Sequence, residues 1–304
     1  MCVMTLVLAS GVLLLHGCAP FWFPFGQARP EQGTPFVDSA LAEAVREAVG
    51  VSHGAVAAAD LASLTSLDAS ARGVRDLTGI ANCTGLISLD LSSNPLDGIL
   101  ELASLATLQT LWLTSTTLAD VSPLAALVGL RQLTIDRNPG VSDISSLLGL
   151  VQLTIFDITS DSVADIGVVS QMTRLRALYV GDNPLSDLSP VSALDELTLL
   201  HAWGTGIEII SSLQNLTDLQ ELHISDCSVK DISALSGLTA LRSLDLSYNR
   251  ISDIQPLALN AGLQSGTVID LTGNPLDIAS GSAASQAIAA LEARGVTVIV
   301  AELQ

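Results

Sequence analysis

The segment LTALRSLDLSYNRISDI, residues 238–254, places apolar residues at a spacing that recurs along most of the chain. It follows the pattern Leu-x-x-Leu-x-x-Leu-x-Leu-x-x-Asn-x-Ile, with the asparagine at Asn249. The segment LISLDLSSNPL, residues 86–96, repeats this pattern around Asn94. Most steps between units are 22 residues, one is 23 where Gly140 is inserted, and one is 25. Anchored at the position of the asparagine, ten units lie in register, at Arg72, Asn94, Thr116, Asn138, Asp161, Asn183, Thr205, Cys227, Asn249 and Asn274.

This pattern is the leucine-rich-repeat signature, and a period of this length predicts a solenoid. Within each unit the Leu-x-Leu stretch alternates between apolar and other residues, which is the periodicity of a strand. Leu89 and Leu91 should therefore face the core, and Asp90 between them should face solvent. We expect an α/β solenoid of about ten 22-residue repeats, whose strands stack in parallel about 4.8 Å apart in one sheet.

Two polar positions recur beside each strand. The asparagine that follows the strand should be buried, where its amide can bond backbone groups that the sheet does not reach. An aspartate four or five residues later begins a short helical turn, at Asp76, Asp120, Asp143, Asp165, Asp187, Asp231 and Asp253. These carboxylates could bind calcium or could cap the turns. We favour capping because Ser or Thr follows most of them and no EF-hand-like ligand spacing is present.

Composition limits the classes of function. The chain has 304 residues, 49% of them hydrophobic and only 3% aromatic, with 12 basic and 31 acidic residues and a formal charge of −19. No basic patch is present, so binding to nucleic acid is not expected. Electrostatic attraction to an anionic membrane is not expected either. A solenoid has one continuous core, so this length does not require two globular domains.

The N-terminus has the features of an export signal. Residues 3–15 are apolar but too few to span a bilayer. They lead into Leu15-His16-Gly17-Cys18, which resembles a bacterial lipobox, although His16 is unusual there and no basic residue precedes the apolar run. The resemblance implies cleavage before Cys18 and lipid attachment to it. The alternative is an ordinary signal peptide with a coincidental cysteine.

Both ends of the repeats should be capped, because a solenoid must cover its apolar ends. A helix over Asp38–Val49 should bury Leu41, Val45, Ala48 and Val49, and a short turn over Ala57–Ser63 should follow it. A second helix over Ser282–Arg294 and a strand over Val296–Val300 should close the other end. We therefore divide the chain into a signal peptide (1–17), a tether (18–35), an N-terminal helical cap (36–60), the repeats (61–279) and a C-terminal cap (280–304).

The flanks of the repeats give a more specific resemblance. Residues 60–69 and 73–79, and residues 262–276 at the other end, are similar to the entry and exit repeats of bacterial internalin-like proteins. The resemblance covers residues 36–304. It implies a right-handed, curved solenoid outside the cytoplasm, in a family defined by its fold and by binding rather than by one shared ligand.

No catalytic motif is present. The sequence lacks a Gly-x-Ser-x-Gly elbow, a His-Glu-x-x-His pair, a Walker loop and a paired-cysteine zinc spacing, so we expect neither an enzyme nor a cofactor. His53 has no motif around it. Cys83 and Cys227 lie more than six repeats apart and cannot form a disulfide.

The solvent-facing side of the sheet, concave in such solenoids, carries an unusual set of residues. Its central position has Trp112, Tyr179, His201 and His223, and Trp203 lies two residues beyond His201. Exposed Trp and Tyr are typical of binding hot spots, although solitary exposed aromatics are also common. We predict a ligand-binding face made of Trp112, Tyr179, His201, Trp203, His223, Asp157, Asp226 and Asp245.

His201, His223 and Asp245 lie at equivalent positions of adjacent units and could in principle share a metal. We expect no metal, because two histidines at equivalent repeat positions arise easily and no supporting residues are evident.

The predicted function is a protein-binding module on the bacterial cell envelope. The alternatives are a glycan- or cell-wall-binding module and a scaffold without a dedicated ligand. The partner is an unidentified protein, which a basic surface would favour, or a glycan. We expect a monomer that contacts the membrane only through an N-terminal lipid.

Overall fold

The computed structural model describes residues 35–300. The predicted signal peptide, the lipid attachment site at Cys18 and nearly all of the predicted tether lie outside these residues. None of the helices within residues 35–300 is both long enough and apolar enough to cross a bilayer.

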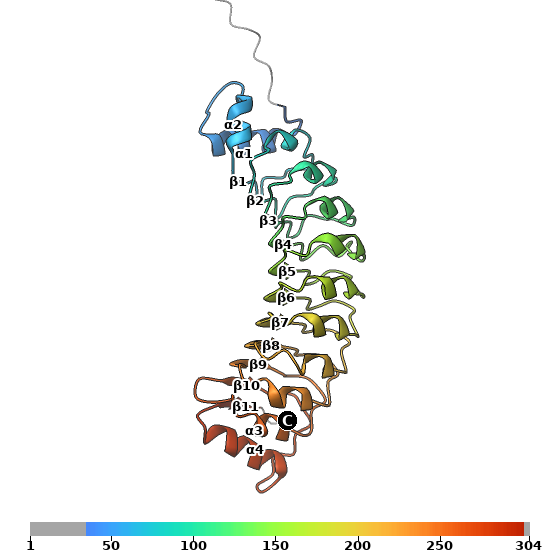
Figure 1. The fold of residues 1–304 in the computed structure, drawn as a ribbon, viewed down its shortest axis with the longest axis vertical. Helices are drawn as coiled ribbons and strands as arrows, with labels where there is room; N and C mark the ends of the chain where they lie inside the picture. Colours follow the sequence, from blue (N-terminus) through green and yellow to red (C-terminus); the bar gives the residue numbers. More distant parts are fainter. Residues whose placement is uncertain (1–34, 301–304) are drawn as a thin grey trace, which may run out of the picture. The chain divides into compact units, whose positions relative to one another are not determined.

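The described residues form one open, parallel sheet of eleven three-residue strands, arranged in sequence order (Figure 1). This arrangement confirms the predicted solenoid. The last strand, β11, comes from the C-terminal cap and pairs with β10, so the sheet extends one strand beyond the repeats. The strands are β1 (Ser66–Asp68), β2 (Ser88–Asp90), β3 (Thr110–Trp112), β4 (Gln132–Thr134), β5 (Ile155–Asp157), β6 (Ala177–Tyr179), β7 (Leu199–His201), β8 (Glu221–His223), β9 (Ser243–Asp245), β10 (Val268–Asp270) and β11 (Thr297–Ile299).

A short 3₁₀ turn follows each strand from β1 to β8, and the short helix α3 (Gln255–Leu259) follows β9. We call the side of the repeats that carries these segments the turn side, and the solvent-facing surface of the sheet the strand face. The turns are η1 (Ile80–Asn82), η2 (Leu100–Ser104), η3 (Ser122–Ala126), η4 (Ser145–Gly149), η5 (Gly167–Gln171), η6 (Ser189–Ala193), η7 (Ser211–Leu213) and η8 (Ser233–Gly237). The core lies between the sheet and these turns. Leu89 and Leu91 are fully buried in it, as is Phe156, which replaces a leucine in β5.

The recurrent asparagines bond the backbone between repeats. Asn94 accepts hydrogen bonds at Oδ1 from the backbone N–H groups of Arg72 (3.1 Å) and Val74 (2.9 Å). Its Nδ2 donates to the carbonyls of Ala69 and Leu91, both at 2.8 Å. Each buried asparagine therefore joins two successive repeats, which confirms the role expected from the sequence.

The recurrent aspartates cap the turns. The carboxylate of Asp120 accepts a hydrogen bond from the backbone N–H of Ser122 at 2.8 Å, and Asp187 does the same for Ser189 at 2.7 Å. Hydrogen bonds from the side chain and backbone N–H of Ser122 hold the pKa of Asp120 below its ordinary value, and those from the backbone N–H and side chain of Ser189 do the same for Asp187. The capping interpretation is confirmed, since each carboxylate bonds a turn N–H two residues ahead of it.

Helices lie at both ends of the repeats. At the N-terminal end are α1 (Ser39–Val49) and α2 (Ala58–Ser63); α1 is capped by Asp38 and ends at Gly50, which has a φ of 74°. The expectation that Ala48 is buried was wrong: Ala48 is exposed. Ala42 and Ala44 are buried instead. At the other end, α3 (Gln255–Leu259) contacts α4 (Ala283–Glu292), and α4 buries Leu291.

Candidate binding face

The central outward position of each strand forms one continuous row across the strand face. Strand pairing aligns Trp112 with Thr134, Tyr179 with His201, and His201 with His223. Aromatic or imidazole rings occupy the row on β3, β6, β7 and β8. Aspartates occupy it on the remaining strands of the repeats except β4, at Asp68, Asp90, Asp157, Asp245 and Asp270. The register predicted from the repeat is therefore observed, with a group of rings between acidic side chains.

Tyr179, His201 and His223 contact one another as a stack of rings. The ring of Tyr179 meets His201 edge-on, with centroids 5.0 Å apart and planes at 88°. His201 and His223 stack face to face, with centroids 4.2 Å apart and planes only 7° apart. All three are partly exposed, so this stack offers a rigid, mostly aromatic surface to a ligand.

Glu221 joins this stack, and sequence reasoning missed it. Its Oε1 lies 2.9 Å from Nε2 of His201 and 3.3 Å from Nε2 of His223. Asp245, the carboxylate expected from the sequence to meet the histidines, instead accepts hydrogen bonds from the N–H (3.1 Å) and hydroxyl (2.6 Å) of Ser247. Glu221 occupies the first outward position of β8, a position that the column of central residues does not include.

Burial and the neighbouring His201 lower the pKa of His223, while Glu221 and Asp245 act in the opposite direction. The net effect favours neutral His223 at neutral pH.

Trp203 lies beside the stack and covers Gly181 of the preceding repeat. A Cβ atom at Gly181 would come within 2.7 Å of the indole ring, so only glycine leaves room for the ring in this position. Trp203 remains 36% exposed. Gly181 thus allows the indole to lie against the sheet while part of it faces solvent, as a binding anchor requires.

The remaining predicted residues differ in how they lie relative to the ring stack. Trp112 lies on β3, three strands from β6, and so is separate from the ring stack. Asp157 is adjacent to Tyr179 and accepts a hydrogen bond from the N–H of Thr159 at 2.9 Å; burial, with a smaller contribution from Asp136, raises its pKa. Asp226 is exposed, in a left-handed backbone conformation with φ of 52°.

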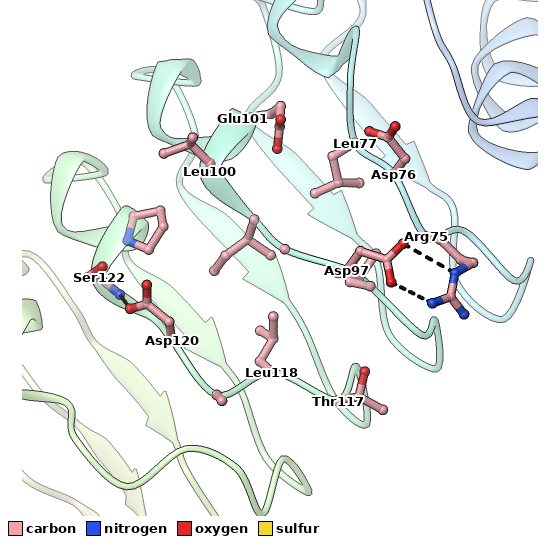
Figure 2. Close-up of a pocket in the computed structure, with 15 residues that line it drawn as sticks. Arg75, Asp76, Leu77, Asp97, Leu100, Glu101, Thr117, Leu118, Asp120 and Ser122 are labelled. Atoms are coloured by element: carbon pink, nitrogen blue, oxygen red, sulfur yellow. Dashed lines mark hydrogen bonds and ion pairs between the residues drawn. The ribbon is translucent and has the colours of Figure 1, made fainter.

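A second feature is a hollow of about 720 Å³, lined by the segments that lead from β1, β2 and β3 into the turns (Figure 2). Its apolar lining includes Leu77, Leu100 and Leu118. Arg75 and Asp97 form an exposed ion pair there, with Nε of the arginine 3.3 Å from Oδ2 of the aspartate. The hollow therefore combines apolar surface with a charged edge.

The column of capping aspartates is interrupted beside this hollow. Counting 22 residues from Asp76 gives Gly98, and a further 22 gives Asp120. A Cβ atom at Gly98 would meet nothing within 4 Å, so the missing side chain leaves open space. The break was visible in the sequence.

Comparison with known proteins agrees with this architecture. Residues 217–259 match the family described as Leucine Rich repeats (2 copies). The solved structure of an internalin C2 from Listeria monocytogenes is 32% identical to the chain, with a TM-score of 0.67; the match covers 71% of this chain and 97% of that one. The chain belongs to the internalin-like leucine-rich-repeat family. Leucine-rich-repeat proteins generally mediate protein–protein interaction.

Two further Listeria monocytogenes structures share the internalin-like fold. The internalin InlF is 24% identical, with a TM-score of 0.54, and the match covers 89% of this chain and 96% of that one. The functional domain of InlJ, which includes a cysteine ladder, is 23% identical with a TM-score of 0.62; the match covers 82% of this chain and 58% of that one. In this chain Cys83 and Cys227 are both free thiols. A comparison with curated proteins finds no match.

Proposed function

We propose that this internalin-like chain is a non-enzymatic, protein-binding module displayed on the bacterial cell envelope, and that it holds its partner on the strand face. The observation that carries the proposal is the cluster of Tyr179, His201, His223 and Trp203 on adjacent repeats. Aromatic side chains are scarce in this chain, and the core is built almost wholly from aliphatic residues. Packing of the core therefore does not explain why rings gather on this face.

The charges around the cluster indicate the chemistry of the partner. Asp157 and Asp245 lie on the repeats that flank the cluster, and Asp226 follows His223 in the same repeat, in a chain of net charge −19. A partner with an apolar centre surrounded by basic residues would complement this surface. The central contacts should determine how long the complex lasts, while the acidic surroundings should accelerate encounter.

Attachment to the envelope would come from the N-terminus. A lipid on Cys18 would hold the repeats near a membrane, with residues 18–35 as the tether. This part of the proposal rests on the sequence Leu15-His16-Gly17-Cys18 alone.

Affinity capture from envelope extract tests the binding face. The bait proteins are the wild type, the double variant Tyr179→Ala/Trp203→Ala, and a matched control, Leu148→Ala/Leu259→Ala, which removes two exposed apolar side chains from η4 and α3. The proposal expects a protein that the wild type and the control retain and the strand-face variant loses. Loss of a glycan instead of a protein would favour a glycan-binding module. Equal capture by all three baits would contradict a site on the strand face.

A further inference from the structure

We propose that His201, Glu221 and His223 form a binding site for a divalent transition metal of the Zn²⁺ class on the strand face. The three side chains come from two adjacent strands, β7 and β8. One ligand atom from each lies within 4.8 Å of the other two. This inference goes beyond the proposed protein-binding function and does not depend on it.

The spacing of the donor atoms is close to that of a tetrahedral zinc site. Zn²⁺ binds imidazole nitrogen and carboxylate oxygen at about 2.0–2.2 Å, which places two ligands of the same ion about 3.4 Å apart. Nε2 of His201 and Nε2 of His223 lie 2.9 Å and 3.3 Å from Oε1 of Glu221. The two measured N–O distances are therefore already close to this spacing, and all three donor atoms lie within 4.8 Å of one another.

The repeat explains why the donors converge. His201 and His223 are paired in register on parallel strands, so their backbones are only about 4.8 Å apart and their side chains leave the sheet in the same direction. Glu221 precedes His223 by two residues on the same strand and therefore lies on the same face. Its carboxylate reaches both imidazoles, as the two N–O distances show.

Binding would require the imidazole rings to turn. They are now nearly parallel, 4.2 Å apart, whereas a metal ion lies close to the plane of each imidazole that binds it. Both histidines are partly open to solvent, with side chains 18% and 28% exposed, which leaves space for this rotation. Three protein ligands would fill only part of the coordination sphere and leave a position facing solvent.

The donor set selects the class of ion. Two imidazoles and one carboxylate suit Zn²⁺ and neighbouring first-row metals such as Co²⁺ and Ni²⁺, whereas Ca²⁺ and Mg²⁺ prefer oxygen ligands alone. The recurrent aspartates on the turn side do not compete for this role, because their carboxylates already bond the turn backbone.

Titration of the full-length chain with ZnCl₂ after chelator treatment tests the site. The variants are His201→Ala, His223→Ala and His223→Gln, and His53→Ala is the matched control because His53 lies outside the cluster. Histidine-selective NMR should show Zn²⁺ shifting the imidazole signals of the two strand-face histidines before that of His53. Each strand-face variant should weaken this binding by about tenfold or more, since even residues that only support a metal ligand can matter that much.

Circular dichroism checks that the variants remain folded. With Co²⁺ as the probe, the spectrum should show nitrogen and oxygen coordination without a thiolate charge-transfer band. The proposal is overturned if the wild type shows no saturable shift of these two imidazoles, or if the variants bind Zn²⁺ as tightly as the wild type does. Because no partner takes part in the titration, either result leaves the proposed protein-binding function to be judged separately.

Discussion

Replacing Asp161 by asparagine should stabilise the protein, and the gain should grow as pH rises. Asp161 stands where other repeats have a buried asparagine. Its Oδ1 accepts a hydrogen bond from the N–H of Asn138 at 2.7 Å, but its buried Oδ2 has no hydrogen-bond partner within the described residues. Burial, helped by repulsion from Asp136 and Asp157, raises the pKa of Asp161 to about 8.

The magnitude follows from proton linkage. An unfolded aspartate loses its proton near pH 4, whereas folded Asp161 keeps its proton until about pH 8. Between these values the folded state binds more protons, so this residue makes the free energy of unfolding fall as pH rises, by up to about 1.4 kcal/mol per pH unit. At neutral pH the accumulated loss is on the order of 4 kcal/mol. Asp161→Asn removes this loss and restores an amide that can donate to nearby carbonyls.

Urea denaturation of the wild type and Asp161→Asn at several values between about pH 4 and pH 8 provides the measurement. The difference between the two proteins isolates Asp161, because their other carboxyl groups are the same. The reverse change, Asn183→Asp, is a matched control, since Nδ2 of Asn183 donates to Ile158 at 2.7 Å and a carboxylate would lose this bond. It should destabilise the protein more at pH 7 than at pH 4. A difference between wild type and Asp161→Asn that does not change with pH would refute the reasoning.

Three further predictions concern the core, the hollow and the anchor. Leu244 is 2% exposed, so Leu244→Ala should lower the free energy of unfolding by about 2–5 kcal/mol, whereas Ser243→Ala on the opposite face should change it little; equal urea midpoints would contradict the register. Gly98→Asp should supply the missing turn cap and raise the free energy of unfolding by about 0.5–1 kcal/mol, which would raise the urea midpoint; a lower midpoint would show that Gly98 has another role. Fatty-acid labelling should disappear in Cys18→Ser and the protein should leave the membrane fraction; unchanged membrane retention would indicate another form of attachment.

The repeat period made most of the fold predictable. Once one unit is aligned, a fixed step of 22 residues sets the register of every strand, and so places Tyr179, His201 and His223 in one row. The buried asparagines and the capping aspartates were predictable for the same reason, because each repeats in the same local environment. Gly98 was equally visible as a gap in the aspartate column.

Contacts that depend on side-chain conformation were not predictable in this way. The period places Asp245 next to His223, but a hydrogen bond to Ser247 holds the carboxylate of Asp245, and the longer side chain of Glu221 reaches both histidines instead. The error at Ala48 has a different cause. Helical periodicity correctly places Ala48 on the same face as the buried Leu41 and Ala44, but Ala48 lies in the last turn of α1, beyond the last buried residue of that helix.

The central claim is that a protein partner binds the strand face, and site-specific photo-crosslinking in intact cells tests it most directly. A photoreactive amino acid would replace Tyr179 or Trp203 on the strand face, and Leu148 or Leu259 elsewhere as controls. The account predicts the same protein adduct from both strand-face positions and none from the two controls. An adduct that forms only from the control positions would contradict it.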